Sequence, residues 1–389
     1  MSAALIQPEG VLGDALEDLC TELFATLRRS DQRRRGMDYI QGLLSTRGRK
    51  SIRNMAALKG SSTGQSLHHF ICSSTWDWIP VRRALAEYLV RLAPPQAHVV
   101  RLLTIPKVGR HSVGVSRYFS VDEGQALNAQ RAVGVWGVSD TVTAPLNWRL
   151  YLPQVWIKDG LRRNQASIPY EAEPETLGDC ALTACRESLA AWGLPPQPVV
   201  VDIEESDPVA TVRGLRALGF PALARVHGEL PLTVHDPALT GHGSHQLTAP
   251  EIMQAARAQF RPMARFETVS GSLPAVRRTA LVAAVGVREP GAGPGGAPLS
   301  LVGVGGPGRR GPAELWLTDH PQPAAAVLRF SDCARRVDRD FDEVTSQVGI
   351  RDYVGRSYSG WHRHTTLASA AHTVSVLAAA AASQARQAS

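Results

Sequence analysis

A small group of acidic residues follows a short apolar run in the middle of the chain. Asp202 ends the run PVVVD (198–202), and Glu204, Glu205 and Asp207 come soon after it. Carboxylate oxygens are the ligands that Mg²⁺ prefers, so this group could hold a catalytic metal ion. The same residues could instead be solvated acids at the start of a helix, where the helix dipole favours negative charge. The pattern alone leaves both interpretations open.

Two histidines stand close together in GWHRH near the end of the chain. His362 and His364 are two positions apart, a spacing that does not place both side chains on one face of a helix. We therefore predict a packing or hydrogen-bonding role for them. Trp76 and Trp78 could stack on bases, but we predict that they anchor a helical segment.

A basic cluster in the N-terminal part of the chain consists of Arg47, Arg49, Lys50 and Arg53. The formal net charge is +7, and only four of the 42 basic residues are lysine. Guanidinium groups bind phosphate in a bidentate manner, so the cluster could contact DNA. A solvated basic turn is the alternative. We predict DNA contact.

The surrounding pattern predicts an α/β fold. Apolar residues at three- and four-residue spacing indicate helices over much of 11–95. Short β-branched and aromatic runs predict antiparallel strands at 98–105, 112–120 and 130–138, with a further strand at 146–153. A strand at 198–202, a helix at 207–219 and a strand at 222–226 then form a crossover unit. Together these elements indicate a mixed sheet with helices.

The second half of the chain is less regular. Segment 227–312 is rich in Gly and Pro, and we predict a loop-rich insertion with a few strands. A helix is expected over 324–349, and an Ala-rich helix over 370–389 ends the chain.

Three blocks of sequence carry a family resemblance. They are RKSIRNMA (49–56) with QSLHHFICSSTWDWIPVR (65–82), GRHSVGVSRYFS (109–120) with QRAVGVWGVSDTVTAPLNWRLYLPQVW (130–156), and VGIRDYVGRSYSGWHRHTTLASAAH (348–372). In order and spacing they resemble a group of DDE-type insertion-sequence transposases. The resemblance implies a ribonuclease-H-like fold and DNA as partner. It also implies cleavage and strand transfer by two Mg²⁺ ions held by two Asp and one Glu.

The resemblance places this carboxylate triad on three positions that match unevenly. The first Asp falls on Leu102, or on Leu103 if the alignment gap moves by one residue. The second matches Asp202, and the catalytic Glu falls on Asp338, a carboxylate one methylene shorter. We therefore expect Asp202 and Asp338 to mark a degenerate metal site, with Mg²⁺ or no metal as cofactor.

Two further departures from the family pattern lie outside the triad. A family Lys falls on Thr345, and a basic, Trp-containing segment is replaced by FETVSGSLP (266–274). Three functions remain open: a catalytically impaired DNA-binding or scaffold protein, which we favour, an active transposase with a rearranged metal site, and an enzyme recruited to small-molecule biosynthesis. The vacated metal pocket would serve the last of these.

The expected domains follow the changes in pattern. They are an N-terminal helical domain (1–95), the first part of a ribonuclease-H-like core (96–226), an insertion (227–312), and the second part of the core with C-terminal helices (313–389). Without an apolar run of roughly 18 residues or a basic, apolar leader, we expect a cytoplasmic protein that does not enter membranes. Five dispersed cysteines are expected to be reduced. A homodimer remains an open alternative.

Overall fold

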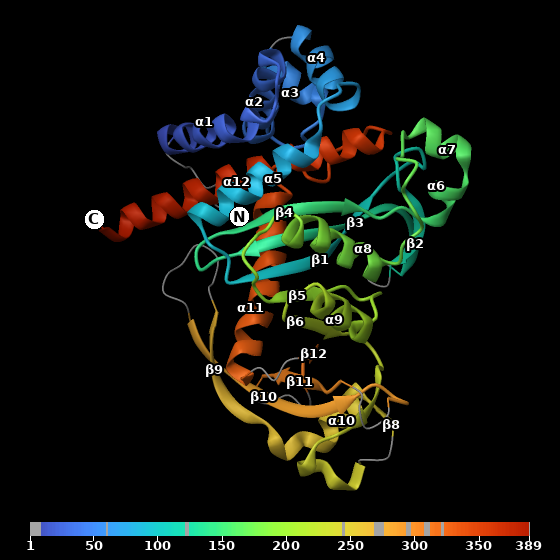
Figure 1. Cartoon of the computed structure of the whole chain (residues 1–389). Helices are drawn as coiled ribbons and strands as arrows, with labels where there is room; N and C mark the ends of the chain where they lie inside the picture. Colours follow the sequence, from blue (N-terminus) through green and yellow to red (C-terminus); the bar gives the residue numbers. More distant parts are fainter. Residues whose placement is uncertain are drawn as a thin grey trace. The chain divides into compact units, whose positions relative to one another are not determined.

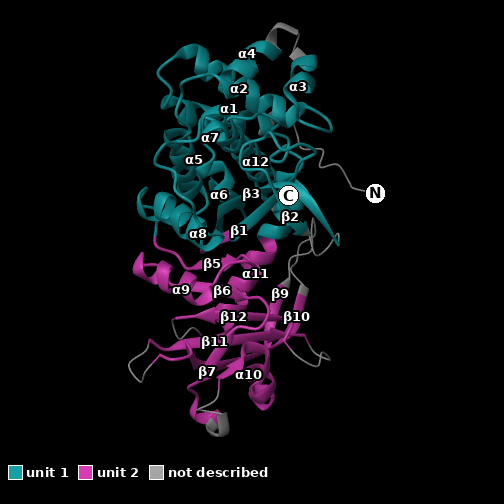
Figure 2. Cartoon of the chain, turned by 90° about the vertical axis from the view of Figure 1, so that its right-hand side faces the viewer, with its two compact units in different colours: residues 1–96, 101–195, 337–389 teal, residues 97–100, 196–336 magenta. Residues whose placement is uncertain are grey.

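The computed structural model describes residues 9–59, 61–120, 124–242, 246–267, 276–292, 297–306, 312–319 and 323–388 (Figure 1). The chain divides into two units, each assembled from segments that are distant in sequence (Figure 2). Unit 1 comprises 1–96, 101–195 and 337–389, and unit 2 comprises 97–100 and 196–336. Strand β1 (Ala97–Pro106) and helix α11 (Ala324–Asp340) each contribute residues to both units.

The N-terminal helices of unit 1 confirm the helical prediction. They are α1 (Glu9–Ala25), α2 (Ser30–Ser45), α3 (Ile52–Lys59), α4 (Ser61–Cys72) and α5 (Trp78–Leu92). Helix α5 begins where it does because the side chain of Asp77 accepts a hydrogen bond from the Ile79 backbone N–H. Trp76, just before this cap, is buried and stacks on Phe70, so it anchors the helices as predicted.

The four strands predicted for this part of the chain are present, and the third of them, not the second, lies next to the first. β2 (Ser116–Ser120) and β4 (Thr143–Leu150) both pair with β3 (Gln125–Val138), and β1 lies next to β3. Three helices follow in the chain: α6 (Gln154–Lys158), α7 (Gly160–Gln165) and α8 (Leu177–Cys185), which continues as the π-helical turn η1 (Arg186–Ala190). A capping box between Thr176 and Asp179 starts α8, which packs against β3 and β4.

A long helix, α12 (Tyr358–Ala388), runs through the core of unit 1. It packs against α1, α2, α5 and β4, and residues 360–374 are buried on every side. Because this part of α12 is buried on all sides, its sequence lacks the apolar and polar faces that mark an amphipathic helix. The helix start predicted from the sequence, Ala370, is therefore too late. By length and composition α12 could also span a membrane, but 61% of its most apolar window is buried inside the protein, as in a core helix.

Unit 2 contains the predicted crossover. β5 (Val199–Asp202) and β6 (Ala222–Val226) pair in parallel, and helix α9 (Pro208–Ala217) connects them. Asp207 caps α9 by accepting hydrogen bonds from the Val209 and Ala210 backbone N–H groups. Asp207, the acidic residue nearest to α9, therefore caps this helix. This agrees with the interpretation of these acids as residues at the start of a helix.

The segment after β6 is more regular than its composition predicts. It forms β7 (Pro231–Val234), β8 (Gln246–Thr248), α10 (Ala249–Ala255), β9 (Arg261–Glu267), β10 (Val276–Arg288) and β11 (Leu299–Gly305), with short 3₁₀ turns η2 (Pro237–His242) and η3 (Ala256–Gln259). β12 (Glu314–Thr318) pairs with both β6 and β11, and β11 pairs with β10. The segment thus extends the sheet of unit 2 by antiparallel strands.

The described elements form a mixed α/β fold with a mixed sheet, consistent with the ribonuclease-H-like class predicted from the sequence. The helix expected over 324–349 is confirmed as far as Asp340. From there it continues as a π-helical turn, η4 (Phe341–Thr345). Turns of this kind are rare and often accompany functional sites.

Candidate functional site

A cavity of about 330 Å³ lies within unit 1, between β1, β3 and β4 and the segment 337–351. Its walls are formed by Arg101, Leu102, Leu103, Thr104, Trp136, Trp148, Val337, Asp338, Phe341, Asp342 and Arg351. Leu102, Leu103 and Asp338, the residues at two of the three expected triad positions, therefore line one cavity.

The residues at the first triad position give this cavity an apolar wall. Leu103 is buried and Leu102 is half-buried, and neither side chain carries an oxygen atom. The neighbouring Thr104, which also lines the cavity, offers a hydroxyl but no charge. A divalent cation at this point of β1 would lack the hard anionic ligand that the family resemblance predicts there.

Asp338 faces a basic partner across the cavity. Its carboxylate forms an ion pair with the guanidinium of Arg101, which precedes Leu102 on β1. One helical turn later Asp342 also lines the cavity, 3.9 Å from the guanidinium of Arg351. Arg351 in turn lies over the ring of Phe341, at 4.7 Å from its centroid. The cavity thus combines two acids, two bases and aromatic walls.

Asp202 belongs to unit 2, where it ends β5 and is almost completely buried. Its Oδ2 accepts a hydrogen bond from Nη1 of Arg225 at 2.8 Å, and its Oδ1 lies 2.7 Å from Nε2 of His227. Glu204 and Glu205 are exposed in the turn after β5. The position of Asp202 at a strand end was readable from the sequence, but its two partners were not singled out.

These residues do not fit a two-Mg²⁺ site. The first position supplies no oxygen, and basic side chains already engage both Asp202 and Asp338. Among the described residues, no group of three or more His, Cys, Asp and Glu side chains is arranged to hold a metal ion. The Mg²⁺ implied by the family resemblance therefore has no fitting donor set here.

The histidines of GWHRH have the predicted packing and hydrogen-bonding role. The Nδ1 atom of His364 lies 2.8 Å from the hydroxyl of Tyr39, and its Nε2 lies 2.9 Å from the carbonyl oxygen of Gly349. Burial lowers the pKa of His364 to about 4, and it lowers the pKa of His362 well below its ordinary value. Both rings are therefore neutral at pH 7, with partners that fix one tautomer of His364.

Thr345, where the family has a Lys, is fully buried. Its hydroxyl lies 3.0 Å from Nδ1 of His372, whose Nε2 lies 2.8 Å from the carbonyl oxygen of Thr143. Burial also lowers the pKa of His372 to about 4. The position serves the core of unit 1. Of the altered segment 266–274, residues 268–274 lie outside the described residues.

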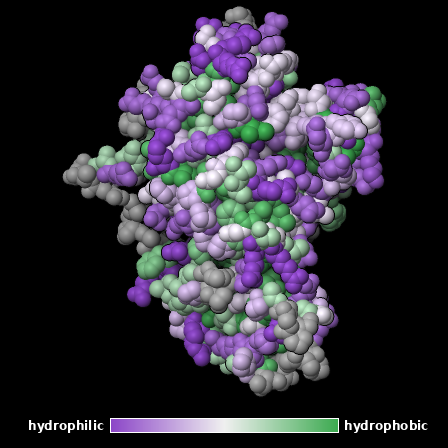
Figure 3. Space-filling model, in the orientation of Figure 1, coloured by the Kyte–Doolittle hydropathy of each residue, from purple (hydrophilic) through white to green (hydrophobic). Residues whose placement is uncertain are grey.

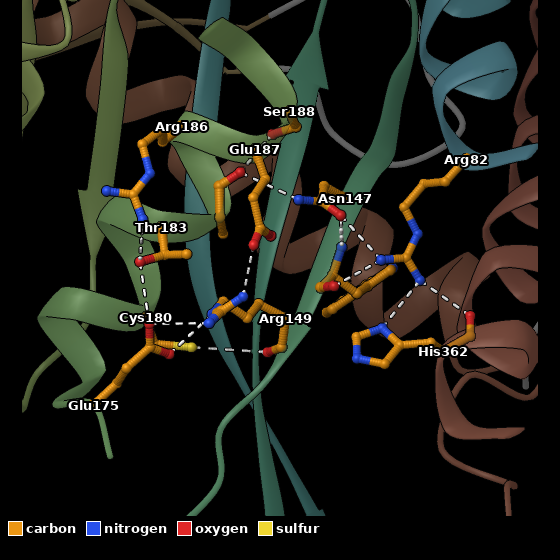
Figure 4. Close-up of polar contacts among 12 residues, drawn as sticks. Arg82, Asn147, Arg149, Glu175, Cys180, Thr183, Arg186, Glu187, Ser188 and His362 are labelled. Carbon is orange, nitrogen blue, oxygen red and sulfur yellow. Dashed lines mark hydrogen bonds and ion pairs between the residues drawn. The ribbon is translucent and has the colours of Figure 1, made fainter. Parts of the chain in front are cut away.

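A buried polar network supports β4 on its helix-facing side (Figure 4). The guanidinium of Arg82 donates to Oδ1 of Asn147, to the backbone oxygens of Trp148 and His362, and to the hydroxyl of Thr366. Burial lowers the pKa of Arg82 to about 10, which still leaves it charged at pH 7.

Arg149, two residues after Asn147 in the chain, lies in the same close-up (Figure 4). It forms ion pairs with Glu175 at 2.9 Å and with Glu187 at 2.8 Å. These ion pairs join β4, which contributes to the cavity wall, to the loop before α8 and to η1.

The predicted basic cluster divides into exposed and buried members. Arg47, Arg49 and Arg53 are exposed at the end of α2 and the start of α3, in a region whose visible face is mainly hydrophilic (Figure 3). Lys50 is buried, and its ammonium donates to the carbonyl oxygen of Thr46. Burial lowers the pKa of Lys50. Lys50 is therefore not part of the exposed basic surface that the three arginines form.

Comparison with known proteins adds a family to this geometry. A sequence model described as DDE superfamily endonuclease matches residues 22–278. The probable transposase for insertion sequence element IS701 from Microchaete diplosiphon is 29% identical over 136 residues, which is 34% of this chain and 34% of that protein. The match thus spans about a third of the relative's length. The family match includes Leu102, Leu103 and Asp202, and it ends before Asp338.

Proposed function

Because this chain belongs to the DDE superfamily endonucleases, we propose that it is a transposase-family protein that binds DNA without cleaving it. The proposal is supported by Leu102 and Leu103, which stand where the family resemblance predicts the first Asp and line the same cavity as Asp338. Two-metal cleavage needs carboxylates that hold both ions near the reacting phosphate. A leucine cannot replace such a ligand, since it has no oxygen.

A cleavage assay tests the loss of catalysis. The full chain is incubated with supercoiled plasmid and with a labelled duplex end, in Mg²⁺ and separately in Mn²⁺. We expect no nicking or joining, and no difference between wild type and Asp202→Ala. Metal-dependent nicking that disappears in Asp202→Ala would overturn the proposal in favour of an active transposase with a rearranged metal site. The exposed Glu204 and Glu205 would then be the first candidates for the missing ligand.

The surface formed by Arg47, Arg49 and Arg53 supports retained DNA binding. Three exposed guanidinium groups within seven residues can neutralise neighbouring phosphates, and each neutralised phosphate releases counterions. We expect duplex binding that weakens steeply with added salt. In a homodimer this surface would occur twice. Sedimentation at several protein concentrations would show whether the protein forms a dimer.

A matched set of variants tests the DNA surface. Reversing Arg47, Arg49 and Arg53 to Glu should weaken duplex binding at low salt by about tenfold or more and flatten its salt dependence. Reversing the exposed residues Arg257, Arg277 and Arg329 changes the net charge equally and should have a smaller effect. Equal losses in both triple variants, measured by fluorescence anisotropy, would show that binding reflects net charge alone.

The cavity itself favours a second candidate function, binding of a small molecule. Its volume of about 330 Å³ lies at the lower end of the range of roughly 300–1,000 Å³ for ligand sites. Acidic, basic and aromatic groups converge on it. A thermal-shift screen with small acids, bases and zwitterions tests this function. A ligand that stabilises wild type but not Leu102→Trp, in which the larger ring fills the cavity, would establish it.

A further inference from the structure

The carboxylates of Asp202 and Asp338, which the family resemblance predicts as metal ligands, are engaged by basic side chains of the protein itself. We propose that Arg225 with His227, and separately Arg101, have taken the place of the divalent cations. Asp202 and Asp338 then form ion pairs with basic side chains of the protein. The protein folds and binds DNA without a divalent metal ion.

The partners of Asp202 follow from strand geometry. β5 and β6 pair in parallel with Val201 opposite Ala224, so Arg225 lies beside Asp202 on the neighbouring strand. Arg225 lies in β6 and His227 follows the end of that strand, and both side chains reach Asp202. One carboxylate oxygen meets Arg225 at 2.8 Å and the other meets His227 at 2.7 Å.

Arg225 is held in position by contacts other than the carboxylate. Trp316 is its cross-strand partner on β12, and the guanidinium carbon lies 5.7 Å from the centroid of the indole ring. Trp316 is itself buried, and its Nε1 donates to Glu314 at 3.2 Å. The basic group is therefore preorganised beside Asp202 and is not a mobile surface side chain that a metal ion could easily displace.

This arrangement disfavours a divalent cation at Asp202 for an electrostatic reason. The Asp202 side chain is only 3% exposed, so the charges around it are weakly screened. The guanidinium of Arg225 already neutralises the charge of the carboxylate. A metal ion would meet like charge instead of the excess of negative charge that attracts Mg²⁺.

The same replacement occurs independently in the cavity of unit 1. Arg101 is the residue next to Leu102 on β1, and its guanidinium pairs with Asp338. The strand that lost the expected carboxylate therefore also supplies the base for the remaining one. Both changes reduce the negative charge that would hold a metal ion.

Direct metal titration tests the proposal on the full chain. Free Mn²⁺ is followed by electron paramagnetic resonance as protein is added, for wild type, Arg225→Met and Arg225→Lys. Wild type should take up no Mn²⁺ beyond weak surface binding. Arg225→Met, which keeps an apolar stem but removes the charge, should bind Mn²⁺ at least about tenfold more tightly. Arg225→Lys retains the charge and should behave as wild type.

Two outcomes would overturn the proposal. One is stoichiometric Mn²⁺ binding by wild type that is lost in Asp202→Asn. The other is a folded Arg225→Met that binds no more Mn²⁺ than Arg225→Lys does. If Arg225→Met does not fold, the titration of wild type against Asp202→Asn decides alone. The readout requires neither DNA binding nor cleavage, so its result is independent of the proposed function.

Discussion

Asp202 and Asp338 are the same residue type, and the family resemblance predicts both as metal ligands, yet their surroundings differ between the two units. In unit 2 the carboxylate of Asp202 is buried between two basic partners. In unit 1 the side chain of Asp338 is 41% exposed, and the side chain of Arg101 with which it pairs is 29% exposed. A buried ion pair depends strongly on both of its members, whereas solvent screens an exposed pair. Asp202 should therefore matter to folding, and Asp338 should matter little.

Histidine shows the same contrast between the units. His227 in unit 2 faces a carboxylate, whereas His364 and His372 in unit 1 face hydroxyl and carbonyl groups. The unit 1 rings are thus held neutral. What a titratable side chain contributes is decided here by its partners and its burial, which the residue type alone does not reveal.

Acidification should produce the largest effect, and it should act on unit 1. The pKa of His364 and of His372 is lowered to about 4 in the folded protein, below the ordinary value of 6.5. Their stabilisation is therefore complete above about pH 6.5 and is lost as pH falls from there toward 4, because the unfolded chain binds the protons first. Over that range, protonation of each of the two histidines should lower the free energy of unfolding by roughly 3 kcal/mol. Denaturant titrations at several pH values measure it.

A double variant with His364→Gln and His372→Gln sharpens this prediction. It should be less stable at pH 7 but should show a flatter dependence between pH 6.5 and 4. His68→Gln alters an exposed histidine and should keep the wild-type dependence. A pH profile that is unchanged in the double variant would mean that other groups cause the acid sensitivity.

Asp202→Asn should give the next largest effect. The amide keeps the size of the side chain but removes the negative charge between Arg225 and His227. Breaking such a pair from one side leaves the partner charge uncompensated, and we expect a loss of about 2–3 kcal/mol in unfolding free energy. Asp31→Asn removes the acid of the exposed Arg29 pair and is the matched control. Equal losses of stability in the two variants would contradict the expectation that the buried pair of Asp202 matters more than the exposed pair of Asp31.

Asp338→Asn should give the smallest effect. The pair with Arg101 is partly exposed, so its loss should cost less than about 1 kcal/mol, and added salt should reduce the difference further. Chemical denaturation at low and high salt would measure both effects. A loss as large as that of Asp202→Asn would show that the cavity wall depends on this pair.

Local sequence patterns predicted much of the fold. The strands β1 to β4 and the crossover β5–α9–β6 were expected because alternating or apolar runs of strand length stand between clear turn signals. The strands β10 and β11 were missed as a continuous part of the sheet. Both strands are rich in Val and Leu, but the Gly- and Pro-rich stretches 291–297 and 305–312 beside them led to the prediction of a loop-rich segment. The pairing of β10 with β11, and of β11 with β12, extends the sheet there.

The site was predicted less completely than the fold. Asp202, Asp338 and Leu102 were singled out from the family resemblance, but Arg101, Arg225 and His227 were not. Side-chain partners across a sheet depend on strand order and register, and a single sequence does not state these. The burial of Lys50 shows the same difficulty, since it stands between exposed arginines in the chain yet turns inward.

The π-helical turn η4 determines how the residues after it are rotated about the helix axis relative to the residues before it. Before it, Asp338 lines the cavity on α11. Within it, Phe341 meets the edge of Trp136, with ring centroids 6.2 Å apart, and Thr345 reaches His372. A helix rotates about 100° per residue, so one added or removed residue turns everything after it by that angle. A single deletion within 341–345 would separate the cavity wall from the histidine contact, which makes chain length at this point as constrained as residue identity.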